Sequence, residues 1–123
     1  MKKYLLLILV PLLSACYKTE CNCNDFKTGK FESEVTVNGV KQRTVSVRTD
    51  SLVIETYKGK TDTATIRWVS DCEYVLRQIH PKTMAEQKAI SIKILTTDQN
   101  SYTFEFGLVG DDARQKGTAR RLE

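Results

Sequence analysis

The chain has 123 residues, a formal net charge of +4, and 28% charged and 41% hydrophobic residues. A chain of this size suits one domain with one core. It contains one histidine. The absence of a G-x-x-x-x-G-K-[ST] motif excludes P-loop nucleotide chemistry. No apolar run approaches the roughly 20 residues that a membrane-spanning helix needs.

The N-terminus has the layout of an export signal. Two lysines, Lys2 and Lys3, precede an apolar run over residues 4–13, which is typical of a secretory signal peptide. The run ends in Leu13-Ser14-Ala15-Cys16, which resembles a bacterial lipobox. We therefore expect cleavage before Cys16 and attachment of diacylglycerol to its thiol. Two or three acyl chains make a durable anchor, because each buried methylene contributes about 0.8 kcal/mol.

The residue after the acylation site bears on the destination. Tyr17 follows Cys16 where a retention signal would have Asp, which by analogy with enterobacterial lipoproteins favours the outer membrane. The expected organisation is a signal peptide over 1–15, a tether over 16–30 and one β-domain over 31–123. Loss of Lys2 and Lys3 lowers the formal net charge from +4 to +2. This small charge predicts no nucleic-acid partner, and the basic C-terminus is interpreted as a solvated tail.

Three cysteines remain after acylation, so one of them has no intramolecular partner. Export permits disulfides. We favour a Cys23–Cys72 bridge with Cys21 as the spare thiol, and Cys21–Cys72 is the alternative. A bridge closing about 50 residues contributes about 2–4 kcal/mol. A zinc site formed by these cysteines and His80 is disfavoured because Cys21-x-Cys23 is tighter than the usual ligand spacing, so we expect no metal and no cofactor.

The rest of the chain shows one strand signal after another. Asn38-Gly39 is a strong hairpin signal between the first two strands. Pro81 begins the one helical candidate, residues 81–87. The predicted strands cover residues 31–37, 40–48, 52–57, 61–69, 73–79, 88–97, 102–108 and 117–122, and the last of them is the weakest.

These elements predict an all-β fold, an antiparallel meander of seven to eight strands. Several strands have one apolar face, and no helix is long enough to cover it, so the sheet must bury that face against itself. The regular hairpins favour a lipocalin-like barrel or a strongly curved sheet, and a β-sandwich is the alternative. An eight-stranded barrel either fills its interior with side chains or holds one small ligand.

No constellation of residues indicates catalysis. His80 precedes a proline at a predicted strand end and is interpreted as a turn residue, and no serine or cysteine lies in a nucleophile motif. We therefore expect a protein that is not an enzyme. The aromatic side chains are candidates for lining a ligand cup, although the filling of an ordinary core is favoured for them. They are Trp68, Tyr74, Tyr102, Phe104 and Phe106.

Several segments carry a resemblance that covers nearly the whole chain. The chain resembles a family of small flavobacterial lipoproteins in the lipobox with "CYKTE" and in the segments "CNDFKTGKF", "DSLVIETYKGKTDTATIRWVSDCEY" and "HPKTMAEQKAISIKILTTDQNSYTFEF". That family has no assigned activity and supplies no site residues. Its members often bear a label naming a DNA topoisomerase IV subunit, which the export signal and the short chain both oppose.

The sequence thus predicts a lipid-anchored protein of the outer membrane that binds a small apolar ligand or an envelope protein partner. A structural or accessory subunit of an envelope complex, with a filled core, is the alternative.

Overall fold

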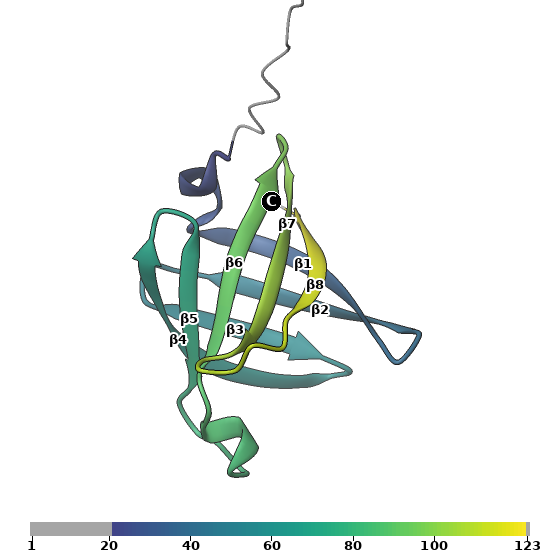
Figure 1. Ribbon diagram of the computed structural model, residues 1–123, viewed down its shortest axis with the longest axis vertical. Coiled ribbons are helices and arrows are strands. Elements are labelled where there is room, and N and C mark those ends of the chain that lie inside the picture. The colour runs from purple at the N-terminus through teal and green to yellow at the C-terminus, as the bar shows by residue number, and fades with distance from the viewer. Residues whose placement is uncertain (1–20, 123) are drawn as a thin grey trace, which may run out of the picture.

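The computed structural model of the chain describes residues 21–122, which form a closed antiparallel barrel of eight strands (Figure 1). Each strand pairs with the next along the chain, and the last returns to the first. The elements in order are η1 (Cys23–Phe26), β1 (Gly29–Val37), β2 (Val40–Arg48), β3 (Leu52–Tyr57), β4 (Lys60–Ser70), β5 (Glu73–Gln78), η2 (Ala85–Gln87), β6 (Ile90–Thr97), β7 (Ser101–Leu108) and β8 (Gln115–Arg121).

The predicted all-β meander is confirmed, and the weakest predicted strand closes it. β8 pairs with β1 over five positions, from Phe31↔Arg121 to Val35↔Gly117. This pairing leaves no free sheet edge and excludes the open curved sheet and the sandwich. β3 has the predicted bounds, whereas β1 begins at Gly29 and β6 at Ile90, within two residues of the predictions. The predicted boundary between tether and domain at residue 31 therefore lies inside β1.

Two hairpins turn on residues with positive φ. Asn38 and Gly39 have φ values of 51° and 79°, and Lys58 and Gly59 have φ values of 50° and 77°. Two successive residues of positive φ twist in the same sense as paired strands, which suits a tight hairpin. The turn predicted at Asn38-Gly39 is thus confirmed, and Lys58-Gly59 repeats it.

The helix predicted over residues 81–87 is reduced to the single 3-10 turn η2. Thr83 Oγ1 accepts the backbone N–H of Glu86, and Glu86 Oε1 accepts the backbone N–H of Lys82. These two bonds give hydrogen-bond partners to backbone N–H groups of a single turn. So short a segment cannot offset the cost of nucleating a longer α-helix. Within residues 21–122, no helix is long and apolar enough to cross a membrane.

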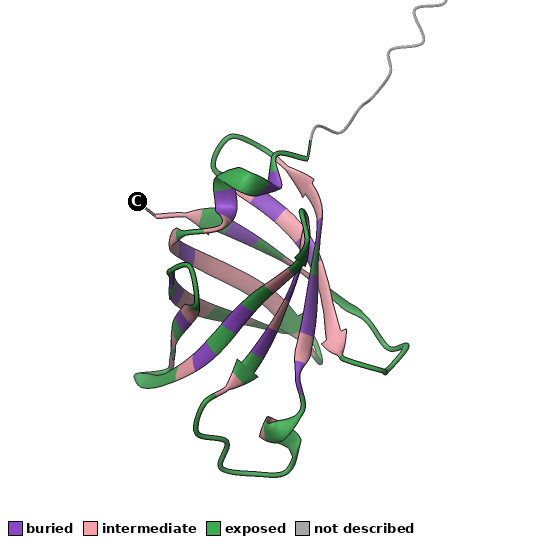
Figure 2. Cartoon of the chain, turned by 90° about the vertical axis from the view of Figure 1, so that its left-hand side faces the viewer, coloured by how far each residue is buried: buried purple, intermediate pink, exposed green. Residues whose placement is uncertain are grey.

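The core lies inside the barrel, and Figure 2 shows buried residues alternating with more exposed ones along the strands. Gly117 on β8 allows close packing of the core, because a Cβ atom there would lie 2.7 Å from Phe104 Cζ and 2.9 Å from Glu34 O. A larger residue at 117 would push the Phe104 ring or the β1 backbone away. The buried cluster consists of Cys23, Phe26, Phe31, Val53, Ala64, Ile66, Tyr74, Leu76, Ile92, Ile94, Tyr102, Phe104 and Ala119.

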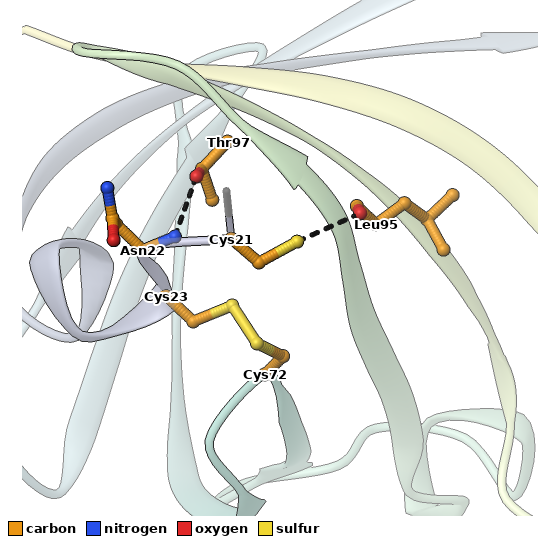
Figure 3. The surroundings of a disulfide bond; sticks show 6 residues. All are labelled: Cys21, Asn22, Cys23, Cys72, Leu95 and Thr97. Atoms are coloured by element: carbon orange, nitrogen blue, oxygen red, sulfur yellow. Dashed lines mark hydrogen bonds between the residues drawn. A yellow bond between two sulfur atoms is a disulfide. The ribbon is translucent and has the colours of Figure 1, made fainter. Parts of the chain in front are cut away.

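The segment before β1 is fixed to one end of the barrel (Figure 3). The predicted Cys23–Cys72 disulfide is present, with its Cα atoms 5.3 Å apart, and joins η1 to the turn between β4 and β5. Cys21 is exposed and free, and its Sγ donates to Leu95 O at 3.2 Å. Two of the three sulfurs of the disfavoured zinc site are therefore in the bridge. Cys16 and the predicted signal lie outside the described residues.

Candidate functional site

The end of the barrel that carries η1 is sealed around a buried arginine. Arg48 is the last residue of β2, points inward and is 6% exposed. Its guanidinium donates to Phe26 O at 2.6 Å, to the Tyr102 hydroxyl at 2.8 Å and to the Tyr74 hydroxyl at 3.2 Å. One side chain thereby connects η1, β5 and β7.

Aromatic rings surround the same guanidinium. The Cζ atom of Arg48 lies 4.5 Å from the centre of the Phe31 ring and 5.0 Å from that of Tyr74. The electron-rich faces of these rings stabilise a cation that is almost entirely buried. Phe26 packs edge-on against Tyr102, with ring centres 5.1 Å apart. We call Phe26, Phe31, Arg48, Tyr74 and Tyr102 the plug.

A second arginine fastens η1 from β8. Arg121 donates to the backbone carbonyls of Asp25 and Thr28 and lies 5.0 Å from the centre of the Phe31 ring. Gly29 is needed beside it, because its φ is +131° and a Cβ atom would lie 2.6 Å from Arg121 Nη1. The carbonyls at the end of a short 3-10 turn thus have charged donors, which form the stronger class of hydrogen bond.

The plug holds its positive charge without an ion pair. Within residues 21–122, no carboxylate lies at ion-pair distance from Arg48, and its buried Nε has no hydrogen-bond partner. Burial opposes the charge, but Tyr74, Tyr102 and the more distant Glu55 favour it, so the pKa of Arg48 is raised. Burial also raises the pKa of Tyr74 well above its usual value, so this phenol stays neutral.

The opposite end of the barrel is open and contains a cavity of about 230 Å³. Inward side chains of β3 to β6 form its wall, and η2 lies at its edge. The apolar part of the wall consists of Ala64, Leu76 and Ile90. The remaining lining residues are Glu55, Asp62, Gln78, Ala85, Glu86 and Lys88.

Glu55 is the residue that β3 contributes to the wall of this cavity. It stands directly opposite Asp62 in the pairing of β3 with β4. Burial raises the pKa of Glu55, the charge of Arg48 lowers it, and Asp62 raises it further, so that the net shift is upward. The carboxyl group therefore accepts a proton at a higher pH than an exposed glutamate does. A ligand that donates a hydrogen bond or carries a positive charge would favour its ionised form.

The five aromatic residues predicted to line a ligand cup are distributed along the barrel. Tyr74 and Tyr102 belong to the plug. Trp68 lies 4.6 Å from Tyr74 between ring centres, at the sealed end, and Phe104 is buried against Gly117. Phe106 lines a neighbouring cavity of about 240 Å³, which shares Ile90 with the first. None of the five lines the 230 Å³ cavity. His80 is exposed in the connection between β5 and β6 and does not line it either.

Sequence reasoning missed Arg48 and Glu55 because the alternation in β2 and β3 is inverted. In β2, Ser46 and Arg48 point inward, whereas Val47 is 41% exposed. A strand with valines on one face and polar residues on the other predicts that the valines face the core. The register of β2 with β3 pairs Val47 with Ile54 on the outer surface instead.

Comparisons with protein-family models, with curated proteins and with solved structures find no match to this chain. A functional proposal therefore rests on the geometry of the barrel and on the residues of the sequence itself.

Replacing Arg48 by leucine should destabilise the protein by roughly 2–4 kcal/mol, because Phe26 O loses its partner and the two tyrosine hydroxyls keep only each other. Urea unfolding measures this loss. Arg67→Leu is the matched control, since Arg67 is exposed on the outer face of β4. A loss below about 1 kcal/mol in Arg48→Leu would show that the aromatic rings seal the barrel without the cation.

Replacing Glu55 by glutamine should stabilise the protein at neutral pH. Because the folded pKa of Glu55 is raised, the folded state binds more protons than the unfolded state, and stability falls as pH rises from the ordinary glutamate value through the raised one. Glutamine removes this fall. Urea midpoints should therefore differ little at pH about 4 and diverge toward neutral pH. A difference that is constant across this range would contradict the titration of Glu55 as the cause.

Proposed function

We propose that this protein is a lipid-anchored lipoprotein of the outer membrane whose barrel binds a small ligand and catalyses no reaction. The observation that carries the ligand-binding part is the cavity at the open end of the barrel, whose other end is sealed by the plug. Binding pockets in barrels lie at the mouth, where a preformed wall and access from solvent coincide.

The lining of the cavity suggests the chemistry of the ligand. Ala64, Leu76 and Ile90 offer an apolar surface, and Glu55, Asp62 and Gln78 offer hydrogen-bond acceptors on the side of β3 to β5. A volume of about 230 Å³ lies below the roughly 300–1,000 Å³ of sites for drug-sized ligands. The ligand proposed here is therefore compact, with an apolar body and one hydrogen-bond-donating or positively charged group.

The anchor rests on the sequence of the N-terminus. The basic start, the apolar run and the small residues before Cys16 together support acylation of its thiol. An acyl anchor would hold the barrel by the sealed end, because Cys21, the first described residue, is fixed there by its bond to Leu95.

Filling the cavity tests the ligand proposal. Residues 17–123, exported without the acyl anchor, should show a mass in native mass spectrometry that exceeds the sequence mass and is lost on denaturation. Ala64→Leu should abolish this excess, because the added carbons occupy the cavity. Thr65→Leu is the control, since Thr65 is the next residue and is exposed on the outer face. A bare mass for the unaltered protein would contradict ligand binding and favour an accessory subunit with a filled core.

Replacing Cys16 by alanine tests the anchor. The unaltered chain should incorporate radiolabelled palmitate and fractionate with the outer membrane, and Cys16→Ala should lose the label, because no thiol remains to accept diacylglycerol. Cys21→Ala is the control, since this nearby cysteine is free and exposed. Acylation that persists in Cys16→Ala would contradict the predicted site.

A further inference from the structure

The open end of the barrel carries large apolar side chains that are exposed to solvent. Among residues 21–122, seven large hydrophobic residues are exposed, and four of them lie at this end. Met84 is 81% exposed, Val40 62%, Val109 55% and Ile79 42%. They lie in or beside the connections that join β1 to β2, β5 to β6, and β7 to β8. An up-and-down barrel places these three connections together with the one that joins β3 to β4. We call these four connections, with two strand residues on each side, the rim.

The two longest connections lie side by side. The backbone N–H of Val109 donates to Ala89 O at 3.0 Å, which joins the β7–β8 connection to the β5–β6 connection. Met84 directly precedes η2 in the β5–β6 connection. Figure 1 shows η2 projecting from the barrel at the end opposite η1. Exposed apolar groups that gather on one end of a soluble domain mark an interaction surface.

The rim is also basic. It contains eight lysine and arginine residues and three acidic residues. The basic residues are Lys41, Lys58, Lys60, Arg77, Lys82, Lys88, Arg114 and Lys116, and the acidic ones are Glu86, Asp111 and Asp112.

The sealed end, counted in the same way with residues 21–28 included, has five residues of each sign. The basic ones are Lys27, Lys30, Arg48, Arg120 and Arg121, and the acidic ones are Asp25, Asp50, Asp71, Glu73 and Asp98. The positive charge of the described barrel is therefore concentrated at the open end.

We propose that the rim docks on an anionic lipid bilayer. Lysines attract the phosphates of a negatively charged membrane surface, and apolar side chains between them enter the boundary between headgroups and acyl chains. A soluble polyanion would account for the lysines, but it leaves Met84 and Val109 without a partner. This docking requires neither the ligand cavity nor the anchor, so its failure would leave the proposed function untouched.

Vesicle flotation tests the proposal. Residues 17–123, which include the whole described barrel, are mixed with vesicles of phosphatidylethanolamine alone or with one-quarter phosphatidylglycerol. We expect flotation only with the anionic vesicles, and less of it at high salt. The charge variant K60Q/K82Q should weaken binding roughly tenfold or more. Its control is R67Q/K93Q, which removes the same charge from exposed positions on the barrel wall.

The apolar contribution is tested separately. Met84→Ser should weaken binding to the anionic vesicles severalfold, whereas Val47→Ser, on the outer wall, should leave it unchanged. Absence of flotation, equal binding to both vesicle types, or equal losses in the rim and wall variants would overturn the proposal. Tight binding to heparin or DNA that is unaffected by Met84→Ser, together with weak vesicle binding, would identify the rim as a polyanion surface and would overturn it as well.

Discussion

The hydrogen bond from Arg48 to Phe26 O is the contact on which the sealed end of this barrel depends. It attaches a short 3-10 turn, which has almost no stability of its own, to the inside of a strand. The same guanidinium reaches Tyr74 and Tyr102, so β2, β5 and β7 share one buried donor. A lone buried cation is costly. Here three oxygen acceptors and the faces of aromatic rings compensate that cost, and each of these groups must be in place for the others to be satisfied.

The sealed end is held together by contacts of different chemical kinds. The Cys23–Cys72 disulfide and the bonds of Arg121 fasten η1 from two further sides. A bridge that spans 49 positions restricts the unfolded chain and contributes about 2–4 kcal/mol in the chain-entropy view. Because η1 is fixed in this way, Cys21, the first described residue, has a defined place at the sealed end, five positions after Cys16. An anchor at that residue would orient the whole domain.

The two ends of the barrel consequently differ in physical character. One end is packed with aromatic rings and has balanced charge, and the other is open, basic and edged with exposed apolar side chains. The polar residues inside the barrel also differ between the two ends. Arg48 is fully bonded into the sealed end except at Nε, whereas Glu55 faces a cavity with space for a ligand. The proposed ligand site and the proposed lipid-docking surface therefore lie at the same end.

The sequence by itself determined the strands and the hairpin at Asn38-Gly39, because these features depend on local signals: alternation and turn residues. It favoured Cys23 over Cys21 as the partner of Cys72 but left both pairings open, and the structure shows the first. It also predicted a meander that buries one face against itself. It did not determine closure, because the pairing of Phe31 with Arg121 joins the two ends of the barrel and follows from the twist of all eight strands. It did not determine which face of β2 points inward either. A period of two separates the faces of a strand but does not assign them, and only the tertiary contacts of Arg48 turned the polar face of β2 toward the core.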